Sequence, residues 1–307
     1  MIVLTGEILI DLIGSNPLEA AMLSYRGVLG GSALNTASIL SRLGLPTRFL
    51  GEVGGDRLGL WAKRRIEERG IDARYLQSLP LPSPLALAEL DAQGNASYTF
   101  YRLFEAPFQP DLTALEGVGW FHFGSLSAFE PRTQAGLRAL LQACRERGVA
   151  VSFDPNFRSP LSPGLRKALE LYQPYLDLIK ASYEDARLLF GPLAPEEALI
   201  ALSQLGGQLT LLTLGSEGAL AFFRGEVLQI PAPRVSVVDT IGAGDTFTAA
   251  TLYGLWHAQV RSRADLVAWP GHQLREILER AAVLAAQACT VPGANLPPEI
   301  ILNWQRT

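Results

Sequence analysis

Short apolar runs that alternate with helical segments constrain the fold of this chain more than any other feature. Each run ends at a polar or glycine-rich turn, and a segment with helical periodicity follows. Strands joined through helices pair in parallel, because the helix carries the chain back to the start of the next strand. We therefore predict an α/β fold with a mainly parallel sheet flanked by helices. Its ligands should bind beyond the carboxyl ends of strands such as 149–153, 176–180 and 209–214.

A hairpin interrupts this alternation. Residues 85–91 and 96–102 are apolar and β-prone, and they flank the turn sequence Ala92-Gln-Gly-Asn95. The chain has 307 residues, which exceeds a typical domain, but α/β folds of this size are often one compact unit with an appended subregion. We expect residues 1–307 to form a single domain.

The charge balance limits the kinds of partner. The formal net charge is −4, and the sequence has no run of Lys and Arg that could form a nucleic-acid or acidic-membrane surface. Cys144 and Cys289 show neither a disulfide framework nor metal-ligand spacing, so we expect buried free thiols. The N-terminus meets an acid at Glu7, and no apolar run reaches the ~18 residues of a membrane span. We expect a cytoplasmic protein with small-molecule partners.

A glycine-rich turn late in the chain carries the strongest chemical signal. The β-branched run Val235–Val238 predicts a strand, and a helix of small residues is expected to begin directly at Asp245. Gly242 and Gly244 allow the backbone between them, with Ala243, to aim its N–H groups at one point beside the positive end of the helix dipole. A lone Asp at a helix start is usually only a cap. Beside donors suited to a phosphate, Asp245 is instead predicted to be the general base of phosphoryl transfer.

Two common nucleotide-binding motifs are absent. None of the three lysines follows a glycine, which excludes the Gly-Lys-[Ser/Thr] phosphate loop. Phe247 stands where a dinucleotide fingerprint needs its third glycine, so nicotinamide chemistry has little support.

A second glycine-rich segment, Gly30-Gly-Ser-Ala-Leu-Asn-Thr-Ala-Ser-Ile-Leu-Ser-Arg-Leu-Gly44, precedes a predicted helix over 33–43. Together with Asp239-Thr-Ile-Gly-Ala-Gly-Asp245 it resembles the two signature segments of the ribokinase-like (PfkB) carbohydrate kinases, in the same order. The resemblance implies a ribokinase-like fold with a small β-sheet lid, formed by about 9–28 and 83–104. It also implies transfer of the γ-phosphoryl group of ATP to a primary hydroxyl of a sugar.

The resemblance also assigns a sugar site, although each residue has a plainer alternative. Asp11 and Asn35 would otherwise be solvent-facing positions on a strand and a helix, Arg102 an edge-strand charge, and Arg158 a partner of Asp154. Gly51-Glu-Val-Gly-Gly-Asp56 looks like a family segment that borders this site. The substrate-binding residues implied by the resemblance are Asp11, Gly30, Gly31, Asn35, Tyr101, Arg102, Arg158 and Asp245.

For nucleotide and metal, the resemblance implies ATP with Mg²⁺. The family has an Asn-x-x-Glu motif near the Mg²⁺, whereas the matching positions here are Ser182 and Asp185, with Glu184 adjacent. Ser182 with two acids in the next turn is equally consistent with an ordinary helix cap. Some members of the family have a K⁺ site, and the matching residues here are Asp239 and Ile241. The implied nucleotide-binding residues are Thr213, Gly215, Glu217, Gly218, Gly242, Gly244 and Ala288.

Several functions stay open at this point. Tyr98-Thr-Phe-Tyr-Arg102 and Phe121-His-Phe-Gly-Ser-Leu-Ser127 look most like a fructokinase, and we expect fructose as the substrate. The nearest alternative is 2-keto-3-deoxygluconate kinase, in which Arg102 would meet a carboxylate. Nucleosides or other hexoses come next. A catalytically silent sugar-binding protein on the same fold is the rival from another class. An edge of the lid sheet is expected to pair with a second subunit in a homodimer.

Overall fold

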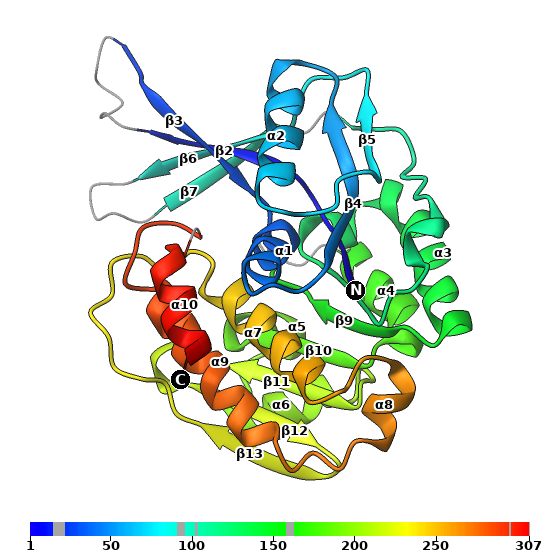
Figure 1. Cartoon of the computed structure of the whole chain (residues 1–307), viewed down its shortest axis with the longest axis vertical. Helices are drawn as coiled ribbons and strands as arrows, with labels where there is room; N and C mark the ends of the chain where they lie inside the picture. The colour runs from blue at the N-terminus through cyan, green and yellow to red at the C-terminus, as the bar shows by residue number, and fades with distance from the viewer. Residues whose placement is uncertain (15–21, 91–95, 102–103, 158–162, 295, 307) are drawn as a thin grey trace.

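A computed structural model describes residues 1–14, 22–90, 96–101, 104–157, 163–294 and 296–306. The main sheet has nine strands in the order β13-β12-β11-β10-β9-β8-β1-β4-β5 (Figure 1). The seven strands from β11 to β5 are parallel, and β12 and β13 are antiparallel additions at one edge. The strands are β1 (Ile2–Thr5), β4 (Thr47–Gly54), β5 (Leu76–Leu79), β8 (Trp120–Gly124), β9 (Ala150–Asp154), β10 (Leu178–Ser182), β11 (Leu209–Thr213), β12 (Ala219–Phe223) and β13 (Glu226–Ile230).

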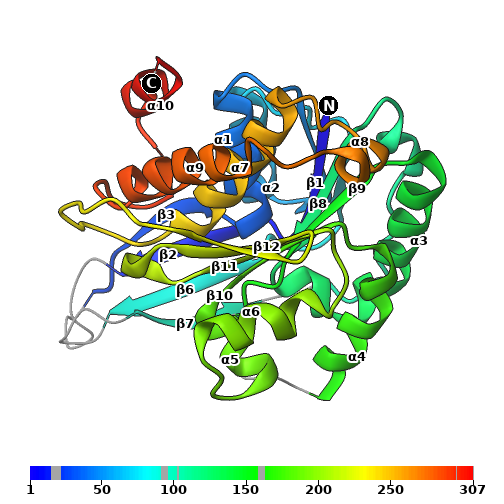
Figure 2. The ribbon, with the colours of Figure 1, turned by 90° about the horizontal axis from the view of Figure 1, so that it is seen from below.

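Helices cover both faces of this sheet, as Figure 2 shows from below. The two faces carry separate buried cores, because side chains alternate between the faces along each strand. The first face is covered by α1 (Ser32–Arg42), α2 (Arg57–Glu68), α7 (Ala243–His257), α8 (Arg263–Ala268) and α9 (Leu274–Ala288), with α10 (Pro298–Arg306) packed on α9. The second is covered by α3 (Pro131–Arg147), α4 (Pro163–Tyr172), α5 (Tyr183–Phe190) and α6 (Pro195–Ser203).

A second, four-stranded sheet projects from the main body (Figure 1). Its order is β3-β2-β6-β7, with β2 (Leu9–Gly14), β3 (Tyr25–Gly30), β6 (Leu85–Leu90) and β7 (Ala96–Tyr101). β2 and β6 are parallel, whereas β2 with β3 and β6 with β7 are antiparallel. The predicted hairpin and the small additional sheet are therefore confirmed, and we call this sheet the lid sheet.

The strand predicted over Val235–Val238 is wrong. These residues follow the edge strand β13 as an irregular segment, and Val237 and Val238 are 62% and 60% exposed. The backbone N–H groups of Val238 and Asp239 both donate to the carbonyl of Cys289, at 2.8 and 3.2 Å, instead of to a strand. β-branched residues favour a strand only where a pleated, half-buried surface receives them, and among the described residues no strand pairs with this segment. The next helix, α7, begins at Ala243, two residues before the predicted start.

One negative finding concerns membranes. Among the helices of the described residues, none combines the length and the apolar character needed to cross a bilayer.

Candidate active site

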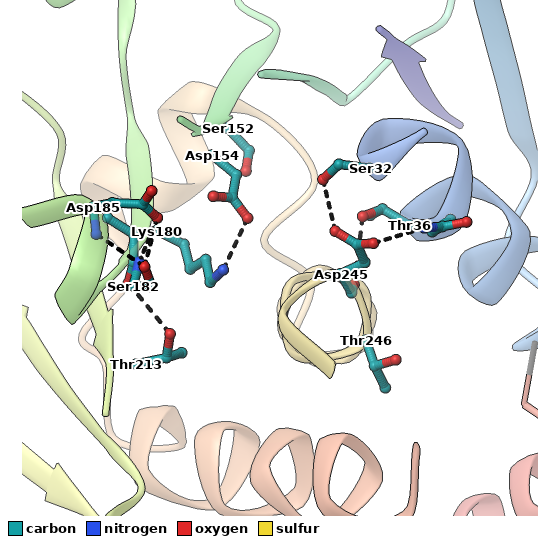
Figure 3. A network of polar contacts seen from close by, with 12 residues as sticks. Ser32, Thr36, Ser152, Asp154, Lys180, Ser182, Asp185, Thr213, Asp245 and Thr246 are labelled. Carbon is teal, nitrogen blue, oxygen red and sulfur yellow. Dashed lines mark hydrogen bonds and ion pairs between the residues drawn. The ribbon is translucent and has the colours of Figure 1, made fainter. Parts of the chain in front are cut away.

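Asp245 lies in the first turn of α7 and faces α1. The residue is 5% exposed, and its carboxylate accepts hydrogen bonds from Ser32 Oγ at 2.6 Å and Asn35 Nδ2 at 2.9 Å (Figure 3). Burial raises the pKa of Asp245, while these two hydrogen bonds act in the opposite direction. Each carboxylate oxygen has a second lone pair, so the group can still accept a proton from a ligand. The predicted neighbours Asn35 and Asp245 therefore do meet, although they are far apart in sequence.

Two consecutive glycines bring the lid sheet against the same helix. Gly31 has φ 120° and is the N-cap of α1, and a Cβ there would overlap the carbonyl oxygen of Glu7. A Cβ at Gly30 would overlap the carboxylate of Asp11, which comes from β2. Only glycine permits these close approaches. The structure thus places Asp11, Gly30 and Gly31 at the start of α1, close to the Asp245 contacts.

The turn before α7 has the conformation expected of an anion cradle. Gly242 is left-handed at φ 80°, and a Cβ on it would lie 2.6 Å from the Cβ of Ala294. The N–H of Ala243 donates within the turn to Thr240 O at 3.2 Å. The N–H groups of Gly244 and Asp245 belong to the first turn of the helix. In that turn the N–H groups have no carbonyl acceptor within the helix itself. These two groups and the helix dipole remain available to an anion.

A group of buried polar side chains from the strands β8, β9 and β10 lies beside this turn. Lys180 Nζ donates to Asp154 Oδ2 at 3.0 Å, and the two side chains are 4% and 2% exposed as residues. His122 Nδ1 lies 3.0 Å from Ser152 Oγ. Burial, followed by the nearby Lys180 charge, lowers the pKa of His122 to about 3, so its imidazole is neutral at neutral pH.

Asp185 caps α5. Its Oδ2 accepts from the N–H and the hydroxyl of Ser182, at 2.9 and 2.8 Å, and the Ser182 hydroxyl in turn accepts from the Asp185 N–H. Oδ1 accepts from the N–H of Phe157 at 2.9 Å. The capping interpretation of this segment is therefore confirmed. Glu184 is exposed on the same turn. The described residues contain no group of three or more His, Cys, Asp or Glu placed to hold a metal ion.

Four of the residues predicted on the nucleotide side, Thr213, Gly215, Glu217 and Gly218, lie at the end of β11 and in the turn after it. Thr213 ends β11, and Gly215–Glu217 form a single 3-10 turn that is exposed. Gly218 is left-handed at φ 101°, and its carbonyl accepts from the N–H of Leu214 at 2.7 Å. Ala288 ends α9 and is 3% exposed, so its side chain is closed to solvent. The glycines therefore shape a turn at the end of β11, as the sequence indicates.

Asp239 ties together the two loops that flank the α7 turn. Its Oδ1 accepts from the N–H of Ile241 at 2.9 Å, and its Oδ2 accepts from the N–H of Gly293 at 2.8 Å. Asp56 has a comparable role at the lid sheet: it caps α2 through Gly59 N and accepts from both N–H and Oγ of Ser83, just before β6. Both carboxylates organise backbone.

Three further residues, Tyr101, Arg102 and Arg158, are predicted to bind the substrate. Tyr101 ends β7 and is 53% exposed. Arg102 and Arg158 lie outside the described residues.

Sequence reasoning missed Ser32, Thr36 and Lys180. Ser32 and Thr36 stand one helical turn apart on α1, and both donate to Asp245, Thr36 to its carbonyl at 3.4 Å. No local pattern distinguishes such hydroxyls from ordinary helix residues. Lys180 did carry a signal, because a lysine within an apolar strand is rarely buried without a specific partner.

Comparison with known proteins supports a kinase. The profile of the pfkB family carbohydrate kinases matches residues 1–301. Aminoimidazole riboside kinase of Salmonella typhimurium is 31% identical over 281 residues, covering 88% of this chain and 85% of that protein. A fructokinase of Escherichia coli is 31% identical over 277 residues, covering 86% of this chain and 87% of that protein. The crystal structure of fructokinase with bound ATP from Xylella fastidiosa superposes with a TM-score of 0.85 at 26% identity, covering 99% and 98% of the two chains. The predicted ribokinase-like fold is confirmed.

Proposed function

The chain belongs to the pfkB family of carbohydrate kinases, and we propose from this premise that it transfers the γ-phosphoryl group of ATP to a primary hydroxyl of fructose. The observation that carries the proposal is the position of Asp245. One carboxylate, oriented by Ser32 and Asn35, stands in the same helical turn as the free N–H groups of Gly244 and Asp245. A general base and an anion site are thus adjacent, as phosphoryl transfer requires.

The sugar oxygen attacks the γ-phosphorus, and the bond from that phosphorus to the β,γ-bridging oxygen breaks, so ADP leaves with the electron pair. Asp245 accepts the proton of the attacking hydroxyl. The N–H groups at the start of α7 stabilise negative charge on the transferring group. Asp11 and Asn35, with Tyr101, Arg102 and Arg158, are proposed to hold the sugar.

Mg²⁺ is the proposed cofactor. Three buried carboxylates, Asp154, Asp185 and Asp245, surround the single ammonium of Lys180, so the pocket has an excess of negative charge. A polyanionic nucleotide fits this pocket better with a divalent cation on its phosphates, and Mg²⁺ is commonly held by substrate phosphates and few carboxylates. Asp185 and the exposed Glu184 are proposed to hold it, through water. K⁺ at the Asp239 and Ile241 backbone is proposed as a further ion.

The choice of sugar rests on the resemblance of the hairpin and of residues 121–127 to fructokinases, together with the similarity to the E. coli fructokinase. A riboside is the second candidate, because aminoimidazole riboside kinase is similar to the same degree over a similar length. 2-Keto-3-deoxygluconate is the third. The intact Asp245 site weighs against a catalytically silent sugar-binding protein.

A panel of acceptors tests the proposal. ATP consumption is measured with fructose, ribosides, 2-keto-3-deoxygluconate and other hexoses, with and without Mg²⁺ and K⁺. We expect Mg²⁺-dependent turnover with the highest kcat/KM on fructose. A higher kcat/KM on a riboside or on the keto acid replaces fructose as the substrate. Sugar binding without ATP consumption for every acceptor contradicts the kinase proposal.

A further inference from the structure

Lys180 is a buried cation in the middle of β10, and its side chain reaches Asp154 of the neighbouring strand and the start of α7. Figure 3 shows its side chain extending from the strand into the space between Asp154 and the start of α7. Burial acts to lower its pKa, but Asp154, Asp185 and Asp245 outweigh burial, so the pKa is raised and the ammonium stays charged.

The ammonium lies directly at the anion cradle. A Cβ built on Gly244 would stand 2.9 Å from Lys180 Nζ and 3.9 Å from its Cε. Gly244 contributes one of the free N–H groups of the first turn of α7. The glycine therefore leaves room for a positive charge beside backbone donors that already favour an anion.

The ion pair with Asp154 does not use all the hydrogen-bonding capacity of either partner. Lys180 Nζ has three N–H donors, and its hydrogen bond among the described residues goes to Asp154 Oδ2. Asp154 Oδ1 is buried and has no hydrogen-bond partner among the residues that the structure describes. A buried pair that serves stability alone normally has these remaining groups satisfied, because each unsatisfied one costs free energy.

We propose that Lys180 is a catalytic residue whose ammonium contacts the γ-phosphoryl group of ATP and stabilises the charge that develops on it during transfer. This inference rests on the proposed kinase function and deepens it. The contact adds a full positive charge to the N–H groups of Gly244 and Asp245, and it acts among buried side chains, where such charges are most effective. The competing role is simple neutralisation of Asp154.

Lys180→Met, Lys180→Arg and the double variant Lys180→Met/Asp154→Leu separate the two roles. The double variant removes both buried charges and so avoids leaving one unpaired. The matched control is Arg48→Met. Arg48 is also a buried cation paired with an aspartate, Asp72 at 2.9 Å, but it lies near the amino end of β4, at the opposite edge of the sheet.

Steady-state kinetics are measured alongside calorimetric affinities for ATP and AMP. We expect Lys180→Met to lower kcat by about 10²-fold or more, as for loss of one charge-stabilising group. It should weaken ATP binding and leave AMP binding unchanged, because AMP has no γ-phosphoryl group. The double variant should remain as slow as the single one. Lys180→Arg should recover part of the loss, and Arg48→Met should alter stability without altering kcat or ATP affinity.

Different results overturn the inference in different ways. Recovery of turnover in the double variant would mean that Lys180 only neutralises Asp154. Equal losses of ATP and AMP affinity in a folded Lys180→Met protein would mean a general structural role. Normal kcat in that variant, with an active wild type, refutes the inference but leaves the kinase proposal standing. A wild-type protein that binds no ATP overturns both.

Discussion

At the scale of single residues, the carboxylate of Asp245 is held in one orientation by α1. Ser32 and Asn35 each bind a different oxygen, so the group is positioned before any ligand arrives. Asp245→Asn preserves the shape but cannot accept a proton. We expect kcat to fall by about 10²-fold or more while the calorimetric affinity for the sugar is retained. The matched control is Asp265→Asn, an exposed carboxylate that binds Arg261 N, which should leave kcat unchanged. Near-normal turnover of Asp245→Asn would refute its role as the base.

His122 predicts a dependence of stability on pH. Its pKa is lowered from 6.5 to about 3 in the folded protein, so the unfolded chain binds a proton that the folded chain does not between these values. The free energy of unfolding should therefore fall as pH drops below 6.5, by at most about 1.4 kcal/mol per pH unit from this group. Urea unfolding at several pH values measures this. In His122→Gln the slope between pH 6 and 4 should be smaller, and an unchanged slope contradicts the assignment.

At the scale of elements, Ser83 connects the lid sheet to the start of α2 through hydrogen bonds to Asp56. Ser83 is 6% exposed, and its hydroxyl donates to Asp56 Oδ1 at 2.6 Å, at the entry to β6. Ser83→Ala removes this bond and keeps the Asp56 cap on Gly59 N. If the lid sheet closes over the sugar, the KM for sugar should rise about 2- to 10-fold with kcat nearly constant, as for loss of one hydrogen bond.

The control for the lid sheet is Thr113→Ala. It removes a similar hydrogen bond from a hydroxyl to a carboxylate, which Thr113 Oγ1 donates to Asp111 at 2.7 Å. The next residue, Ala114, accepts a hydrogen bond from Arg48 through its carbonyl. A KM that is the same in both variants would show that the Ser83 contact does not govern sugar binding.

At the scale of the whole molecule, the last helix, α10, contacts three of the helices that cover the first face of the sheet, α1, α7 and α9. Trp304 is 2% exposed; its Nε1 donates to Arg280 O at 2.8 Å, and its ring packs on Tyr253 of α7 with centroids 5.4 Å apart. Gln305 of the same helix donates to Leu43 O at the end of α1. Trp304→Ala should cost about 3–5 kcal/mol of unfolding free energy, measured by urea denaturation. Leu302→Ala, on the same helix but 53% exposed, is the matched control and should cost far less.

The homodimer expected through an edge of the lid sheet also belongs to this scale, and it stays a prediction. Light scattering of the purified protein tests it, and a monomeric mass contradicts it.

Local sequence by itself determined those features that depend on backbone chemistry. Helix α3 begins at Pro131, which suits a first helical turn, and is ended by Gly148, which is left-handed at φ 68°. Gly242 and Gly244 likewise favour a tight turn before α7, whatever the surrounding structure.

The tertiary structure alone decided which side chains meet. Val235–Val238 has strand-forming residues, but the sheet offers it no partner. Asp185 accepts a hydrogen bond from the N–H of Phe157, and Lys180 stands at the start of α7. Such contacts join residues far apart in the sequence, and their free energy depends on how strands and helices pack together. No local pattern contains that information. The glycine turn before Asp245 could therefore be predicted from the sequence, whereas its contacts with Ser32, Thr36 and Lys180 could not.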